Sequence, residues 1–160
     1  MNSFLYYLTY GSALGSGLIA GIFFAFSTFV MKALAKLPAE QGIAAMQSIN
    51  TTILQTLFGL VFMGTALISV FLGVAAWFNW SSPGALYMLI GSLLYLLGCF
   101  LVTGILNVPL NDALAAVKPE SSEGARVWAG YLSDWVVWNH VRTIASLAAL
   151  VSFIIAIRKW

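Results

Sequence analysis

The sequence predicts an all-α protein, a four-transmembrane-helix bundle that forms a single domain over residues 1–160. Hydrophobic residues make up 61% of the chain and charged residues 8%, which is typical of membrane proteins and too apolar for a small water-soluble domain. Residues 41–111 contain no Asp, Glu, Lys or Arg. We therefore expect the chain to lie in a bilayer.

Four apolar segments are long enough to cross a hydrocarbon core of about 30 Å, which takes roughly 20 residues of helix. We expect them at residues 6–32, 55–77, 85–106 and 138–157. The first segment has no basic residue before it and exceeds the core of a signal peptide, which is about 7–15 residues long. We therefore interpret it as an uncleaved membrane span.

Four spans place both termini on one side of the membrane and the 1–2 and 3–4 connections on the other, which we call the loop side. Basic residues favour the cytoplasmic side. The terminal side carries Arg158 and Lys159, whereas the loop side carries Lys32, Lys36, Lys118 and Arg126. The expected location is the cell (inner) membrane, with the 1–2 and 3–4 loops in the cytoplasm.

Two further patterns concern packing. Glycines four residues apart, Gly11 with Gly15 and Gly17 with Gly21, predict close helix–helix contact within the chain, or alternatively a seam between copies in a homo-oligomer. Before the second span, apolar residues recur at helical spacing from Gly42 onward. This pattern predicts an amphipathic extension of the bundle on the loop side.

One face of the fourth segment carries polar and aromatic side chains. Counting back roughly 20 residues from Arg158 places Arg142 about one turn inside the loop-side boundary, where a charge is costly. Arg142 is either a structural cation that extends toward the interface or a functional charge paired with Asp112, or else with Asp134. His140 lies nearly opposite Arg142 on a helical wheel. The face itself comprises Trp128, Trp135, Asn139, Arg142, Thr143 and Ser146.

Further polar residues gather at the end of the third segment, where Asn107, Asn111 and Asp112 flank Pro109. Because proline lacks an N–H group and pushes the preceding residue toward an extended conformation, we expect the helix to stop or bend near Asn107. Asn107 is then either the cap of a short helix over residues 108–117 or a ligand contact. Gln47 and Asn50 lie either on a solvated face or in the pocket, and Ser27 completes the predicted site.

Four stretches of the sequence resemble the anthrone oxygenase-like integral-membrane family, formerly catalogued as a domain of unknown function. The more specific two run from Asn107 to Leu114 and from Trp135 to Thr143, and the others from Gly21 to Ser27 and from Gly42 to Asn50. The resemblance implies a four-helix membrane protein and a monooxygenase-type oxidation. The substrate it implies is a hydrophobic aromatic or phenolic compound, which would react with dioxygen at the polar pocket.

The residues constrain how such an oxidation proceeds. One histidine, one cysteine and two nearby acids are a poor set of metal ligands, so we predict no metal site and no bound cofactor; a haem held by His140 alone is the alternative. In a cofactor-free route a base removes a proton, and donors stabilise the resulting oxyanion. The predicted residues are His140 or Asp112 as the base, Asn139 and Arg142 as donors, and Trp135 or Trp138 as a stacking wall. The other predicted contacts with substrate are Asn107, Asn111, Gln47, Asn50 and Ser27.

A non-enzymatic function is the alternative. The same polar face would suit a membrane protein that binds a lipid headgroup or a hydrophobic small molecule, or an accessory subunit. The alternative role of His140 is a hydrogen-bonded packing residue that ties the fourth segment to residues 107–112. Membrane lipid and a hydrophobic small molecule are the expected partners under either interpretation, and a net charge of +2 gives no indication of nucleic-acid binding.

Overall fold

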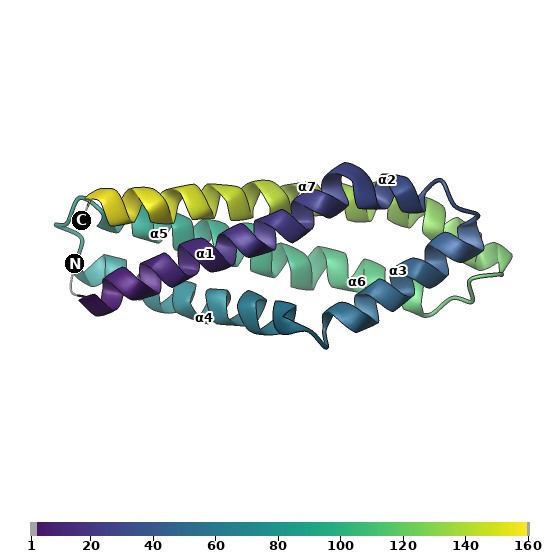
Figure 1. The fold of residues 1–160 in the computed structure, drawn as a ribbon, viewed down its shortest axis with the longest axis horizontal. Coiled ribbons are helices and arrows are strands. Elements are labelled where there is room, and N and C mark those ends of the chain that lie inside the picture. The colour runs from purple at the N-terminus through teal and green to yellow at the C-terminus, as the bar shows by residue number, and fades with distance from the viewer. Residues whose placement is uncertain (1–2, 160) are drawn as a thin grey trace.

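The computed structural model describes residues 3–159, and within this range the regular elements are all helices (Figure 1). Several of them run end to end through π-helical turns and form longer continuous helices. The elements are α1 (Ser3–Ala25), π-helical Phe26–Val30, α2 (Met31–Leu34), α3 (Ala39–Ile53), α4 (Leu57–Phe78), α5 (Ala85–Leu93), π-helical Leu94–Leu101 and Thr103–Asn107, α6 (Val108–Ala115) and α7 (Ser122–Lys159).

Four of these helices are long and apolar enough to cross a membrane, as predicted. The first two lie close to their expected positions, at Ser3–Leu34 and Leu57–Phe78. The third and fourth extend well beyond them on the loop side, at Ala85–Ala115 and Ser122–Lys159. The loop-side ends of these helices therefore form a structured extension rather than loose connections.

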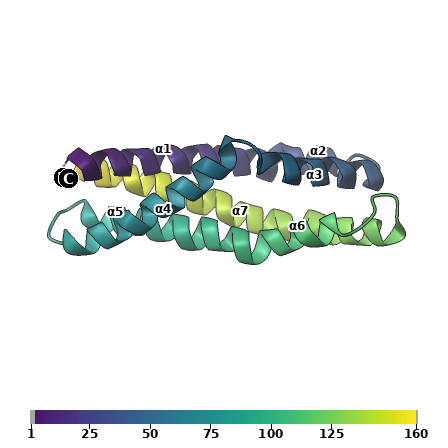
Figure 2. The same cartoon turned by 90° about the horizontal axis from the view of Figure 1, so that it is seen from below.

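Each of the four spans packs against two neighbours. Helix α1 contacts α7 and α4, and α5 contacts the same two helices from the other side. The beginning of α1 and the end of α7 lie at one end of the molecule, with α2, α3 and α6 toward the other end (Figure 1). Helix α4 crosses the bundle obliquely and meets α3 at a break (Figure 2). At this break Thr56 caps α4, because its hydroxyl oxygen accepts a hydrogen bond from Phe58 N at 3.2 Å.

The apolar side chains form two cores. The bundle core includes fully buried residues such as Ile19, Leu72 and Phe153. The loop-side core joins α2, α3, α6 and the first half of α7, and it consists of Met31, Ile43, Met46, Leu114, Trp128, Tyr131 and Trp135. Helix α7 runs through both cores. The predicted amphipathic extension is confirmed, because α3 buries its apolar face here.

The helix does not stop near Asn107, so that part of the prediction is wrong. Val108 has helical dihedral angles, φ −61° and ψ −46°, so the helix continues into α6 although Pro109 supplies no N–H group. The turns just before it, Thr103–Asn107, are π-helical. We attribute the continuity to these wider turns, which leave room for the proline ring. Asn107 also makes no side-chain cap.

Of the glycines spaced four residues apart in α1, only some pack against other helices of the chain. Gly15 lies against the Thr65 side chain of α4, so closely that an added Cβ would collide with its hydroxyl, and Gly17 faces Leu150 of α7. Gly11 and Gly21 have open space where a Cβ would be. Gly15 is therefore a site of close helix approach, whereas a side chain at Gly17 would make an ordinary van der Waals contact with α7.

This difference predicts the outcome of a matched pair of substitutions in α1. Gly15→Ala is expected to lower the free energy of unfolding by about 1–3 kcal/mol, because the new methyl group overpacks the contact with Thr65. Gly11→Ala meets open space and gains helix propensity, so it is expected to be neutral or slightly stabilising. Reversible unfolding in mixed detergent micelles measures both. Equal effects of the two substitutions would contradict the packing described for α1 and α4.

Candidate functional site

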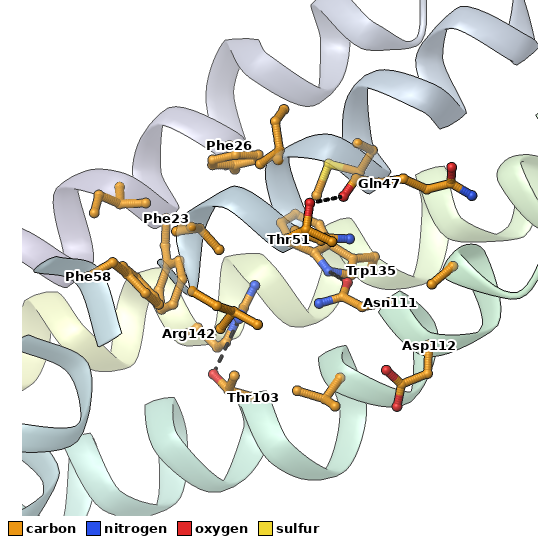
Figure 3. A pocket seen from close by; sticks show the side chains of 18 residues that line it. Phe23, Phe26, Gln47, Thr51, Phe58, Thr103, Asn111, Asp112, Trp135 and Arg142 are labelled. Carbon is orange, nitrogen blue, oxygen red and sulfur yellow. Dashed lines mark hydrogen bonds between the residues drawn. The ribbon is translucent and has the colours of Figure 1, made fainter. Parts of the chain in front are cut away.

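A cavity of about 480 Å³ lies where the two cores meet (Figure 3). Phe23 and Phe58 belong to the side of the bundle core, whereas Phe26, Met46 and Trp135 belong to the side of the loop-side core. Its volume is within the usual range for small-molecule sites. The wall is mostly apolar, and its polar members are Gln47, Asn50, Thr51, Thr103, Asn111, Asp112 and Arg142.

Arg142 is the charged group in the interior of this cavity. Its side chain is 4% exposed. One terminal nitrogen, Nη2, donates to Asn139 Oδ1 at 2.7 Å, and the other, Nη1, donates to Thr103 Oγ1 at 3.3 Å. The guanidinium carbon lies 4.1 Å from the centre of the Phe23 ring and 5.1 Å from that of Trp135. Its Nε–H group has no partner among the residues that the structure describes.

Asn139 is the residue that fixes Arg142 in place. Its fully buried amide donates to the Phe23 carbonyl oxygen at 2.8 Å and to Ser27 Oγ at 2.7 Å, while its own oxygen accepts from Arg142. The Ser27 hydroxyl also lies 3.0 Å from Thr143 Oγ1. This network ties α7 to the end of α1. The polar face predicted on the fourth span is therefore confirmed, since all six of its members are buried.

A second network joins α6 to α7 on the other side of the cavity. Asn111 Oδ1 accepts hydrogen bonds from Tyr131 Oη and from Trp135 Nε1, each at 2.8 Å. The Asn107 amide donates to the Trp135 carbonyl oxygen at 3.1 Å, and its own oxygen is buried without a partner among residues 3–159. The Tyr131 and Trp135 rings stack at 5.6 Å. Trp135 is thus held at its ring and at its backbone.

Gln47 holds the end of α6 against α3. Its amide nitrogen donates to the carbonyl oxygens of Leu114 at 2.8 Å and Val117 at 3.1 Å. Carbonyl groups at a helix end lack partners within the helix, so Gln47 supplies a donor that the backbone cannot. Thr51, one turn further along α3, faces the cavity. Gln47 has a structural contact in addition to its place in the cavity wall.

The predicted site residues fall into three groups. Six line the cavity: Gln47, Asn50, Asn111, Asp112, Trp135 and Arg142. Three lie behind the wall and support it: Ser27, Asn107 and Asn139. Two lie outside it. His140 is exposed on another face of α7, and Trp138 lines a separate groove beside Asp134 and Pro109.

The predicted pairing of Arg142 with an acid is wrong. Asp112 lines the cavity, but it is exposed, and Figure 3 shows its carboxylate separated from the guanidinium. Asp134 lies in the other groove and shares a hydrogen bond with Ser133 at 2.8 Å. Within the described part of the chain, Arg142 has no carboxylate partner. Its contacts are to neutral oxygens and aromatic rings instead.

Three residues of the candidate site were not predicted from the sequence. Thr103 accepts a hydrogen bond from Arg142, Tyr131 donates one to Asn111, and Phe23 lies against the guanidinium. Two of them carried a usable signal. Thr103 and Tyr131 each lie four residues before a predicted site residue, Asn107 and Trp135, and therefore share its helix face.

The cavity opens sideways, between the junction of α3 with α4 and the first turns of α6. At this opening the lining residue Leu54 is 73% exposed and Val108 is 39% exposed. Thr51, Asp112 and Ala115 are exposed lining residues of the same region.

Metal-binding side chains do not gather in residues 3–159, where no group of three or more His, Cys, Asp or Glu residues comes together. His140 is exposed, and Cys99 is buried in the bundle core. The absence of a bound cofactor stays a prediction.

Comparison with known proteins decides the family. A family model described as anthrone oxygenase matches residues 54–152, which is more than half of the chain. The chain belongs to the anthrone oxygenase family. No curated protein and no solved structure matches it. The family match runs from the end of α3 through most of α7, and it includes Thr103, Asn111, Asp112, Trp135 and Arg142 of the cavity.

As an anthrone oxygenase family member with four apolar spans, the protein is a multi-pass membrane protein. The resemblance drawn from the four sequence stretches is confirmed at the level of the family. Two of those stretches, from Gly21 to Ser27 and from Gly42 to Asn50, lie outside the matched region, although both contribute residues to the cavity or its support.

The support of Arg142 by Asn139 predicts a stability effect. Asn139→Leu is expected to lower the free energy of unfolding by about 1–3 kcal/mol, because buried groups of Arg142, Phe23 and Ser27 lose their partner. The neighbouring His140→Ala changes an exposed residue of the same helix and is expected to have an effect within about 0.5 kcal/mol. Thermal unfolding in detergent, followed by tryptophan fluorescence, compares them. A larger loss for His140→Ala would contradict the site geometry.

Proposed function

We propose that the protein binds a flat, hydrophobic phenol or enolisable aromatic ketone in the cavity and oxidises it with dioxygen. The observation that carries the proposal is the composition of the wall. Phe23, Phe26, Phe58 and Trp135 line the cavity, and the rings of Phe23 and Trp135 lie against a buried guanidinium that has no acidic partner among the described residues. The membership of the anthrone oxygenase family favours the same class of reaction.

The proposed reaction proceeds without an added cofactor. A base removes a proton from the acidic CH₂ group of an anthrone, and the negative charge spreads onto the carbonyl oxygen. The carbanion adds to dioxygen, so that a C–O bond forms and a peroxide anion results, which takes up a proton. Loss of the second hydrogen from the same carbon and cleavage of the O–O bond then release water and leave a new C=O group. The substrate supplies the four electrons that reduce dioxygen.

Three residues have roles in this scheme. Arg142 stabilises the oxyanion, because a preorganised cation in an apolar cavity acts strongly on developing negative charge. Asp112, on the cavity wall at the opening, takes the proton and passes it to water. Trp135 supplies a stacking surface that Asn111 holds in position. His140 has no role in the scheme, because it lies outside the cavity.

An assay with dithranol, a dihydroxyanthrone, tests this function. Purified protein in nanodiscs is expected to accelerate oxygen uptake and anthraquinone formation above the rate in empty nanodiscs. Arg142→Met is expected to reduce the accelerated rate about 10²–10³-fold. Asp112→Asn is expected to reduce it by about 10²-fold or more. His140→Ala is the matched control and should keep the wild-type rate.

Two results would contradict the proposed function. A wild-type rate equal to the spontaneous rate would show that the protein does not oxidise this class of substrate. Loss of activity in His140→Ala, with Asp112→Asn unchanged, would place the base on the opposite face of α7.

A further inference from the structure

We propose that the cavity takes its ligand as an anion, whose oxygen atoms bind to the guanidinium edge of Arg142. This inference rests on the proposed function in one respect, because both place the ligand in the same cavity. It goes further in naming the charge of the bound molecule and the atoms that recognise it. It concerns binding and does not depend on turnover.

Arg142 has hydrogen-bond donors that no group of the described chain uses. A guanidinium carries N–H donors on all three nitrogens and has no acceptor. Only two hydrogen bonds to protein are present, from Nη1 and Nη2, and Nε–H is buried with no partner among residues 3–159. Buried donors are nearly always satisfied in folded proteins. A group from outside the chain would complete the set.

The buried positive charge of Arg142 also favours an anionic ligand. Arginine stays protonated in proteins, and a buried charge without a counter-ion is costly, so charges inside membrane proteins normally pair. Here the partners are the neutral oxygens of Asn139 and Thr103, and the nearest acid on the wall, Asp112, stands apart at the opening. The positive charge therefore lacks its complement in the described chain. An anionic ligand supplies it.

The surroundings of the guanidinium limit how an anion can approach it. The rings of Phe23 and Trp135 lie against the guanidinium, at 4.1 and 5.1 Å, and the side chain is itself part of the cavity wall. With two rings at the guanidinium carbon, the N–H edge is the part of the group left to bind a ligand, and Nε–H is the donor on it without a partner among residues 3–159. Carboxylates, phenolates and enolates bind such an edge through oxygen, often with two hydrogen bonds. The aromatic wall, including Phe58, then contacts the apolar body of the ligand.

Two kinds of molecule carry an oxygen anion on an apolar body. One is a flat aromatic acid, phenolate or enolate, and the other is a phospholipid whose headgroup phosphate enters through the opening beside Leu54 and Val108. Both would use the same edge of Arg142. The rings of Phe23, Phe26, Phe58 and Trp135 favour the flat aromatic anion.

A pair of probes of the same shape tests the proposal. Anthracene-9-carboxylate is an anion, anthracene-9-carboxamide is neutral, and neither has the CH₂ group that the proposed oxidation needs. Binding to the wild-type protein in zwitterionic nanodiscs is measured by quenching of tryptophan fluorescence. The carboxylate is expected to bind at least about tenfold more tightly than the carboxamide, as a charge-assisted contact requires. Equal affinities would overturn the proposal.

Variants assign the preference to Arg142. In Arg142→Met the ratio of the two affinities is expected to fall to about one, whereas Arg142→Lys keeps part of it. Phe58→Ala is the matched control in the wall and should weaken both probes alike. A preference that persists in Arg142→Met overturns the assignment. If that variant does not fold, the infrared carboxylate band of the bound, ¹³C-labelled probe decides: a shift from its position in water is expected, and an unshifted band overturns the proposal.

A competition separates the two sources of the anion. If phosphatidylglycerol added to the nanodiscs displaces the carboxylate probe from the wild type, the oxyanion site is a lipid headgroup site; if it does not, the aromatic anion is the ligand. The proposed oxidation is judged separately, by dithranol turnover. Charge preference without turnover would leave an anion-binding membrane protein, and turnover without charge preference would leave an oxygenase that binds neutral substrate.

Discussion

The buried guanidinium of Arg142 is the constraint on which the loop-side half of the molecule depends. A charge at this depth must be surrounded by oxygen atoms and polarisable rings, because neither lipid nor an apolar core can solvate it. Asn139, Thr103, Phe23 and Trp135 provide that surrounding, and they come from three separate helices. Their positions set the spacing of α1, the third span and α7. A cavity remains where the two cores meet.

The π-helical turns adapt two of these helices to the site. Ser27 lies in the π-helical stretch of the first span, and Thr103 and Asn107 lie in that of the third. Such turns widen the helix and redirect side chains, and they are frequent at functional sites. In the third span they also carry the chain past Pro109 without a break. The same local distortion therefore serves both continuity of the helix and placement of polar groups.

The sequence predicted the four spans and the polar face of α7 because both follow from length, hydropathy and a regular helical period. Its errors came from features without a period. The π-helical turns have no residue signature, so proline at position 109 predicted a break that is absent. The costly position predicted for Arg142 agrees with its burial, but distances between helices cannot be read from one chain, and the expected pair with Asp112 does not form. Contacts such as that of Asn139 with the Phe23 carbonyl depend on backbone groups that every sequence has.

In the structure described, the Arg142 side chain is buried and fixed, and its Nε–H group lacks a hydrogen-bond partner among residues 3–159. Nuclear magnetic resonance of protein labelled with ¹⁵N at arginine Nε observes that group directly, and Arg142→Lys assigns its signal among the chain's three arginines, Arg126, Arg142 and Arg158. The account predicts that the Nε–H of Arg142 exchanges slowly with water and shifts when anthracene-9-carboxylate is added, while the other two signals do neither. An Arg142 signal that exchanges as fast as those of Arg126 and Arg158, and is unchanged by the anion, would contradict it.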